Sequence, residues 1–315
     1  MVEENDTHVH EFILLGFPTT TNLQALLFVV FLAVYLLTVT ENIVIITLII
    51  THHQLHKPMY FFLGHLAFLE ACYISVTVPK LLVTFAVRKK SISFGGCMAQ
   101  LYFFITLVCT ECVLLAVMAC DRCAAVCAPL RYALTMSRRA CLQLAAASWL
   151  LGFLIAALKV SFISQLSFCS PSLVNHFYCD ISPLLSLSCA ERRLAETVDF
   201  ISALFILLIP LSVIIVSYTC IISTVLLIPE AQNRKKAFST CASHLAVVII
   251  FFSATLFMYA RPRSVNSRDL NKLVSIIYTV VTPMLNPFIY CLRNQEVKDT
   301  LLKALCSRAA LPRVS

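Results

Sequence analysis

Three glutamates, Glu41, Glu70 and Glu111, lie inside long apolar stretches of this 315-residue chain. An ionisable group at membrane depth is costly, so such residues are functional candidates by default. The alternative is that they are neutral, hydrogen-bonded acids that hold neighbouring helices together, which is the favoured interpretation for Glu41 beside Asn42. The same side chains would also suit the cation path of a channel or transporter.

A charged pair, Asp121 and Arg122, closes one of these apolar stretches. An ion pair between these neighbours would restrain the arginine until the surrounding helices separate, which describes a switch. The alternative is that Arg122 anchors the helix end by extending toward the lipid headgroups.

Cysteine and glycine positions argue against metal and phosphate chemistry. Two pairs of cysteines have the C-x-x-C spacing of zinc or redox sites: Cys109/Cys112 and Cys120/Cys123. Each pair lies on a single apolar stretch with no second pair nearby, so we exclude a metal there. Five glycines in the whole chain also exclude a glycine-rich phosphate loop. We also do not expect an enzyme, because His52, His53 and His56 lack the H-E-x-x-H pattern and a partner cysteine constellation.

The elements that position these residues must be membrane helices, because 60% of the residues are hydrophobic and only 13% are charged. A bilayer core about 30 Å thick needs about 20 apolar residues per helix. Seven stretches meet this requirement: residues 23–50, 59–87, 97–120, 142–160, 198–228, 237–259 and 272–292. They lack the alternating polarity of barrel strands. We predict an all-α, seven-transmembrane helix bundle over residues 23–292, after an extracellular N-terminus of residues 1–22.

Loop charges predict which way the bundle faces. With the N-terminus outside, the cytoplasmic loops and tail hold the larger share of the 24 Lys and Arg residues. The sequence Asn5-Asp-Thr fits an N-glycosylation site, which requires the same orientation. Dispersed basic residues give no continuous surface for nucleic acid. In the tail, residues 293–315, apolar residues at helical spacing predict a short amphipathic cytoplasmic helix: Val297, Leu301, Leu302 and Leu305.

Two lysines, Lys80 and Lys159, fall toward the outer ends of predicted spans. We expect both to extend to the lipid headgroups. The alternative is a counter-ion for an acidic ligand, a role for which Arg261 and Arg263 compete.

The predicted topology divides the 15 cysteines by compartment. Four face the oxidising side: Cys97, Cys169, Cys179 and Cys189. Four cysteines allow three disulfide pairings, and the sequence alone leaves all three open. The remaining cysteines are interpreted as small buried hydrophobic residues.

Four segments in order along the chain resemble those of vertebrate odorant receptors of the tetrapod-type subgroup, which are rhodopsin-like G-protein-coupled receptors. The segments are residues 58–63 (PMYFFL), 118–130 (MACDRCAAVCAPL), 236–244 (KAFSTCASH) and 283–290 (PMLNPFIY). The second segment departs from the family pattern MAYDRYVAIC, because Cys120 and Cys123 replace tyrosines. The resemblance covers almost the whole chain.

The resemblance implies a receptor that binds small apolar odorants and activates a stimulatory, olfactory-type G protein, which raises cAMP. It implies a multi-pass protein among the lipids of the plasma membrane, in the cilia of olfactory sensory neurons. It also implies disulfides between Cys97 and Cys179 and between Cys169 and Cys189. No cofactor is expected apart from an allosteric sodium ion.

In related receptors the positions of Glu70 and Glu111 form an inner cavity that holds this sodium ion. Glu70 departs from the usual Asp, and its extra methylene moves the carboxylate. The resemblance further assigns Asp121 and Arg122 to the G-protein switch, with Tyr218 and Tyr290 as active-state partners.

Asn286 and Pro287 form a predicted hinge, because proline removes a helical hydrogen bond and leaves a carbonyl for polar neighbours to satisfy. The odorant cavity should be mostly apolar and lie in the outer half of the bundle. Helical spacing nominates its lining: Phe104, Ile105, Val108, Cys109, Cys112, Ala203, Ile206, Leu207, Thr255, Tyr259, Ile276 and Thr279.

Overall fold

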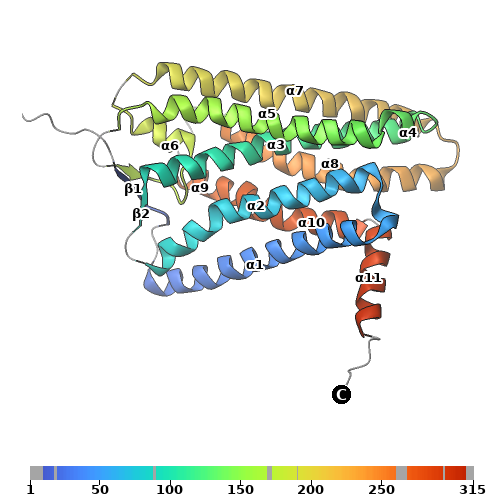
Figure 1. Cartoon of the computed structure of the whole chain (residues 1–315), viewed down its shortest axis with the longest axis horizontal. Helices are drawn as coiled ribbons and strands as arrows, with labels where there is room; N and C mark the ends of the chain where they lie inside the picture. Colours follow the sequence, from blue (N-terminus) through green and yellow to red (C-terminus); the bar gives the residue numbers. More distant parts are fainter. Residues whose placement is uncertain are drawn as a thin grey trace, which may run out of the picture.

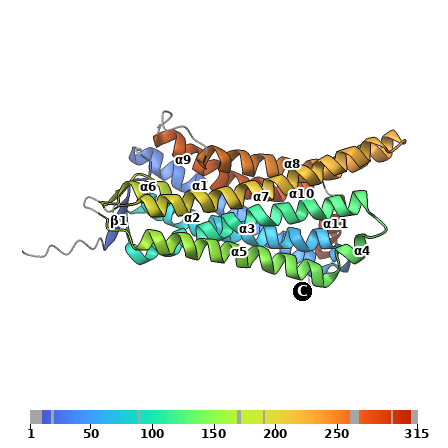
Figure 2. The ribbon, with the colours of Figure 1, turned by 90° about the horizontal axis from the view of Figure 1, so that it is seen from above.

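The computed structural model describes residues 10–17, 20–87, 90–168, 172–189, 191–259, 268–293 and 295–309. Within these residues, seven helical segments are long and apolar enough to cross a membrane, which confirms the predicted bundle. The helices run side by side along the long axis of the molecule (Figures 1 and 2). The first six spans are α1 (Thr21–Thr51), α2 (Pro58–Ala86), α3 (Phe94–Cys127), α5 (Arg138–Ser164), α7 (Arg193–Leu226) and α8 (Ala231–Tyr259).

The seventh span contains a π-helical turn, which its apolar run did not predict. It consists of α9 (Arg268–Ile276), a π-helical turn η2 (Ile277–Val281) and α10 (Thr282–Arg293). Four short helices complete the chain: η1 (His53–Leu55), α4 (Tyr132–Thr135), α6 (Ile181–Ser186) and α11 (Gln295–Ala309). π-helical turns inside helices frequently occur at functional sites, and this one directly precedes the segment that contains Asn286.

Local sequence explains where several helices begin. Pro58 occupies the first turn of α2, where its missing N–H is not needed. Ser93 and Ser137 precede α3 and α5, and each side-chain oxygen accepts a hydrogen bond from a first-turn backbone N–H. The serines therefore stop each helix from extending further toward the N-terminus.

The helix α3 forms the centre of the bundle and packs against α2, α5 and α7. It is buried on nearly every side, which is the pattern of a helix that is apolar all round. In contrast, α1 and α7 each expose a row of large apolar side chains, including Val29 and Phe205, each 61% exposed. These rows are the faces that a spanning helix presents to lipid.

The helices α3 and α5 approach each other closely at Gly152. A Cβ atom at this position would lie 2.2 Å from Thr110 Oγ1 and 2.7 Å from the backbone oxygen of Thr106. Small residues at such crossings let helix backbones come together, and the resulting close packing is a main source of helix association in membranes.

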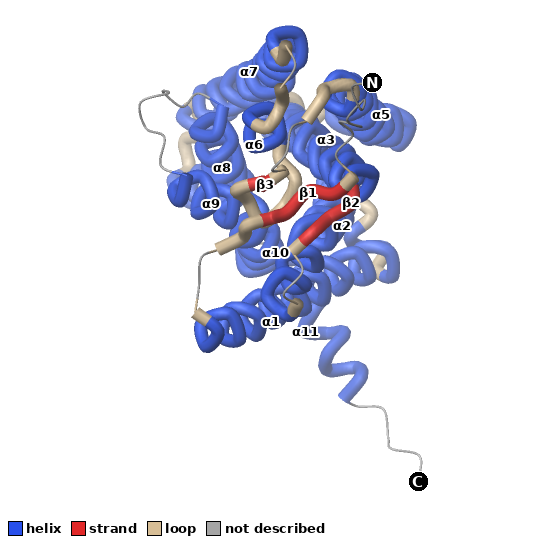
Figure 3. Tube along the Cα trace, turned by 90° about the vertical axis from the view of Figure 1, so that its left-hand side faces the viewer, coloured by secondary structure: helices blue, strands red, loops and turns tan. Residues whose placement is uncertain are grey.

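A three-stranded sheet crosses one end of the bundle, which we call the cap end (Figure 3). The strand β1 (Glu11–Leu14) lies between β2 (Ser91–Ser93), to which it is antiparallel, and β3 (Leu173–Val174), to which it is parallel. Phe12 and Leu14 point inward and are fully buried. The prediction of an all-α fold did not include this sheet.

A disulfide between Cys97 and Cys179 fastens the chain near the cap end, where it joins the start of α3 to the segment before α6. This is the pairing that the resemblance implies. Such a cross-link stabilises a fold by about 2–4 kcal/mol, chiefly by restricting the unfolded chain in the usual model. Cys189 is also disulfide-bonded. Its expected partner, Cys169, lies outside the described residues, as does Asn5.

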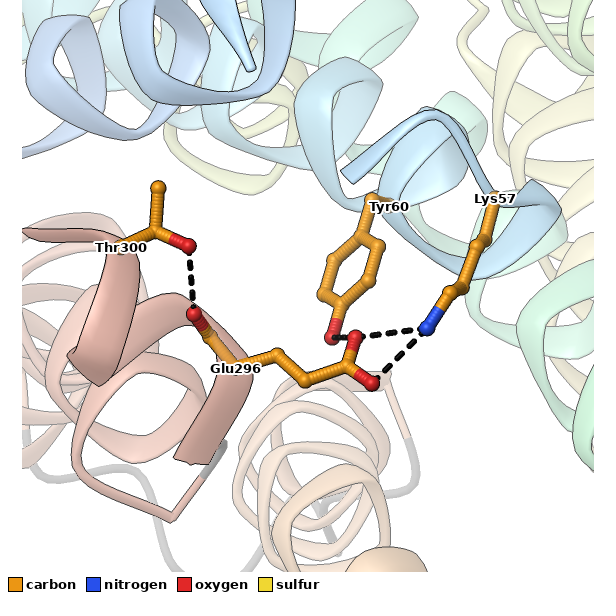
Figure 4. A network of polar contacts seen from close by, with 4 residues as sticks. All are labelled: Lys57, Tyr60, Glu296 and Thr300. Carbon is orange, nitrogen blue, oxygen red and sulfur yellow. Dashed lines mark hydrogen bonds and ion pairs between the residues drawn. The ribbon is translucent and has the colours of Figure 1, made fainter. Parts of the chain in front are cut away.

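At the opposite end, which we call the tail end, α11 turns away from the bundle axis (Figure 1). Glu296 holds its first turn: both carboxylate oxygens accept hydrogen bonds of 2.8 Å from Lys57, and Oε2 accepts another from the Tyr60 hydroxyl (Figure 4). These donors lower the pKa of Glu296 below its ordinary value. Val297 is buried, whereas Leu302 is half exposed, so α11 has one apolar face in contact with the bundle.

Candidate functional site

The buried acid Glu70 joins two helices in the middle of the bundle. Its Oε1 atom accepts a short hydrogen bond from Asn286 Nδ2, so α2 is linked directly to α10. Beside this contact is a cavity of about 10 Å³, to which Asn42, Glu70, Asn286 and Pro287 contribute. A cavity needs about 10–15 Å³ to hold one water molecule, so the space suits a single small occupant.

Glu70 and two side chains that interact with it carry oxygens that have no hydrogen-bond partner among the described residues: Glu70 Oε2, Glu111 Oε1 and Asn286 Oδ1. Glu111, on α3, is buried and interacts electrostatically with Glu70. Hard cations prefer oxygen ligands of this kind. Since no three His, Cys, Asp or Glu residues gather in the described part of the chain, amide or hydroxyl oxygens would have to complete the coordination. The donor set fits a small hard cation.

Asp121 is buried, and its carboxylate accepts a hydrogen bond of 2.8 Å from the Tyr132 hydroxyl on α4. The expected ion pair between Asp121 and Arg122 is not formed among the described residues. Consecutive residues of a helix do not face each other, although Arg122 still acts electrostatically on Asp121. Burial and the neighbouring Asp121 raise the pKa of Tyr132 above its ordinary value, so the phenol keeps the proton it donates.

Arg122 acts electrostatically on the side chains of two further helices, Tyr218 on α7 and His244 on α8. The Tyr218 hydroxyl lies 2.7 Å from His244 Nδ1 and 3.3 Å from the carbonyl oxygen of Cys241. The His244 ring is fully buried and also interacts with the backbone of Leu115 on α3. At the tail end, a direct contact therefore joins Tyr218 of α7 to His244 of α8, and Arg122 of α3 lies near enough to act on both electrostatically. We call Arg122, Tyr218 and His244 the tail-end cluster.

Tyr132 and His244 are the functional candidates that the sequence analysis missed. His244 stands in the quoted segment 236–244, but a single buried histidine gives no spacing signal. Tyr132 follows Asp121 by 11 residues and lies beyond a loop, so helical periodicity could not predict their contact. The side chain of Tyr290, predicted to join this switch, lies outside the described residues.

Most of the predicted odorant-contact residues are buried. These are Phe104, Ile105, Cys109, Cys112, Ala203, Ile206, Leu207, Thr255 and Thr279. Val108 and Ile276 are partly buried, and the side chain of Tyr259 lies outside the described residues. The Phe104 ring packs against Tyr178 and Tyr278, with ring centroids 4.8 and 6.2 Å away. Phe104 of α3 therefore meets the seventh span near the cap end through Tyr278, a residue that was not nominated.

The cap itself is held by buried polar contacts. Lys272 is 3% exposed and donates a hydrogen bond of 2.6 Å to the backbone oxygen of Gly16, which ties the N-terminal segment to α9. His176 Nε2 lies 3.1 Å from Ser275 Oγ. Burial lowers the pKa of His176 to about 3, so this histidine is neutral at physiological pH. The Tyr178 and Tyr278 hydroxyls hydrogen-bond to each other below it.

The expectation that Lys159 extends to the headgroups is wrong. Its side chain is 2% exposed, and Nζ lies 2.7 Å from Asp199 Oδ1 on α7. Buried charges are normally paired, and Asp199 inside a predicted span was the available signal. Lys80 likewise points to the protein, where Nζ donates a hydrogen bond of 2.6 Å to the Ser91 backbone oxygen. Arg261 and Arg263 lie outside the described residues.

Comparisons with known proteins agree on one family. A family model described as olfactory receptor matches residues 31–308. The chain is 55% identical to human Olfactory receptor 6P1 over 306 residues, which is 97% of this chain and 96% of that protein. It is 56% identical to mouse Olfactory receptor 6B9 over 307 residues, or 98% and 97% of the two chains. Rat Olfactory receptor 226 is 55% identical over 301 residues, or 94% and 92%.

Proposed function

Because this chain belongs to the olfactory receptor family, we propose that it binds small apolar odorants in the cap-end half of the bundle and activates a stimulatory, olfactory-type G protein that raises cAMP. Membership of the family makes it a G-protein-coupled odorant receptor and not an enzyme. The channel or transporter alternative has no such support. The ligand class and the type of G protein are the parts that we propose.

The observation that carries this proposal is the cluster of Arg122, Tyr218 and His244. It brings together α3, α7 and α8 at the tail end, where Tyr218 and His244 are buried and Arg122 is partly buried. A ligand shifts a conformational equilibrium only through its different affinity for the two states. An odorant that changed the packing of Phe104, Ile206 and Thr255 would favour one arrangement of the same three helices. The change in helix arrangement would then alter the contacts of Arg122, Tyr218 and His244 at the tail end, where the G protein binds.

The apolar ligand class is supported by the nominated residues themselves. They are aromatic, aliphatic or weakly polar, and Lys159, which acts electrostatically on Cys109 and Cys112, is already paired with Asp199. The free-energy cost of desolvation is therefore lower for an uncharged odorant in this region than for a carboxylate. We place the cap end outside and the tail end in the cytoplasm, in the plasma membrane of sensory cilia.

A cAMP reporter assay against a panel of uncharged odorants tests the receptor function. We expect Arg122→Ala to lower the maximal response about tenfold or more at equal surface expression, because the tail-end cluster loses its charge. Arg193→Ala removes an arginine from the cap end of α7 and should leave the response unchanged. Odorant-evoked current in cells without any G protein would contradict the proposal, as would full cAMP signalling by Arg122→Ala.

We also propose that Glu70, Glu111 and Asn286 hold a sodium ion. A ligand that binds only the folded state raises the melting temperature, so sodium should stabilise the detergent-solubilised receptor relative to N-methylglucamine at equal ionic strength. Glu70→Gln should abolish the sodium-dependent shift, whereas Glu41→Gln should retain it. Equal melting temperatures of the unaltered receptor in the two salts would show that no sodium binds.

A further inference from the structure

An apolar cavity of about 390 Å³ lies between α3, α5 and α7, which are neighbours in the bundle (Figure 1). Its walls include Val113, Ala116 and Val117 of α3, Ile155 of α5, and Phe205 and Pro210 of α7. Ligand cavities are typically about 300–1,000 Å³, so this one is large enough for a small molecule. Of the residues nominated for odorant contact, only Ile206 lines it.

The cavity opens on the side of the bundle that faces lipid. Its inner wall is buried, since Ala116 is 6% and Val117 9% exposed. Its rim is exposed, since Phe205 is 61% and Ile209 55% exposed on a helix that spans the membrane. An occupant would therefore arrive from the hydrocarbon of the bilayer, without passing the cap end.

The lining also defines the chemistry of the occupant. Every residue that lines the cavity is apolar apart from the weakly polar thiol of Cys120. A headgroup, an ion or a zwitterion would lose its hydration there without gaining a charged or strongly polar partner. The walls suit a small uncharged molecule with an apolar surface.

The helices that form the α3 and α7 walls of the cavity each continue to a residue of the tail-end cluster. Cys120 lines the cavity, and its thiol lies 3.8 Å from Ser217 Oγ. Asp121 and Arg122 follow it directly on α3, and Ser217 precedes Tyr218 on α7. Pro210, in the α7 wall, removes a backbone donor from the helix and leaves α7 easier to bend at the cavity.

We propose that this cavity is a second ligand site, in which a small uncharged apolar molecule dissolved in the bilayer binds between α3, α5 and α7 and adjusts receptor coupling. The effect on coupling rests on the proposed signalling function, whereas binding does not. The site shares only Ile206 with the nominated odorant contacts, so we expect both sites to be occupied together. An occupant that wedges α7 away from α3 changes how Tyr218 meets His244.

Photolabelling of the full-length receptor in lipid nanodiscs tests the binding step. The probe is a saturated ten-carbon hydrocarbon that carries a diazirine, and mass spectrometry locates the labelled peptides. Label should concentrate on residues 113–120 of α3 and 205–213 of α7. Ala116→Phe and Val213→Phe fill the cavity from opposite walls and should each lower that labelling about tenfold, equivalent to 1.4 kcal/mol. Because the two variants fill the cavity from different helices, either one can test the site if the other does not reach the cell surface.

Ala147→Phe is the matched control, because Ala147 is exposed on α5 and does not line the cavity. Its labelling should equal that of the unaltered receptor. Label spread evenly over the lipid-facing helices, or label unchanged in both filled variants, would overturn the site.

The coupling step is tested separately. With an activating odorant held at saturation, addition of the unmodified ten-carbon hydrocarbon should change the maximal cAMP response of the unaltered receptor but not of Ala116→Phe. Site-specific labelling with no change in response would overturn the regulatory role and leave the binding site standing. A receptor that raises no cAMP with any odorant would contradict the proposed function, while the labelling result would still decide the site.

Discussion

Gly152→Ala should markedly destabilise the receptor, because one added methyl group has no space between α3 and α5. The new Cβ would lie 2.2 Å from Thr110 Oγ1 and 2.7 Å from the Thr106 backbone oxygen. The Thr110 hydroxyl is held in place, since it donates a hydrogen bond of 2.7 Å to the same Thr106 oxygen. The two helices must therefore move apart, and overpacking of this kind costs about 1–3 kcal/mol or more.

The melting temperature of the solubilised receptor and its surface expression measure this effect. Thr110→Ala combined with Gly152→Ala should recover only part of the loss, because the Thr106 oxygen remains. Gly95→Ala, also on α3, is the control, since a Cβ there meets nothing within 4 Å. Wild-type stability of Gly152→Ala would show that α3 and α5 do not pack as closely as described.

Asp199→Asn should also destabilise the receptor strongly, because it removes a charged partner that lies 2.7 Å from a buried lysine. Lys159 is 2% exposed, and its Nζ lies 2.7 Å from Asp199 Oδ1. Removal of one partner from a buried ion pair typically costs about 3–5 kcal/mol, since the other charge remains desolvated. Replacement of both partners by apolar residues is often nearly neutral, so Lys159→Met with Asp199→Leu should melt well above Asp199→Asn.

The control is the exposed ion pair between Arg192 and Glu196, at 2.8 Å, in which both side chains are 46% exposed. Exposed pairs contribute about 0–1 kcal/mol, so Glu196→Gln should change the melting temperature little. If Asp199→Asn and Glu196→Gln had equal effects, the Lys159 pair would have to be hydrated and not buried.

The sequence predicted the spans because their signal is local. A window of 20 apolar residues is sufficient to place a helix in a membrane, whatever it packs against. The π-helical turn in the seventh span was missed for the same reason, because the composition of residues 277–281 suits a membrane helix of either form. The strand β1 was missed because its pairing partners, Ile92 and Val174, are distant in the sequence.

Site residues could be predicted where an ionisable side chain interrupts an apolar run, because its burial is energetically costly. They could not be predicted where their role depends on a contact with another helix. Glu70 stood out as an acid in an apolar run, but its bond to Asn286 depends on the packing of α10 against α2. Lys159 was recognised as unusual, yet its exposure was misjudged, because helical spacing within one span says nothing about Asp199 on another. Tyr132 had no local signal at all.

The strand β1 also determines how the receptor can be modified for display at a cell surface. Leu14 is fully buried, and the chain that follows it is fastened to α9 through Gly16 and Lys272. A fused epitope or leader peptide therefore belongs before His10, where it leaves the strand intact. A fusion that replaced residues 11–16 would remove the central strand of the sheet and the acceptor for a buried lysine at the same time.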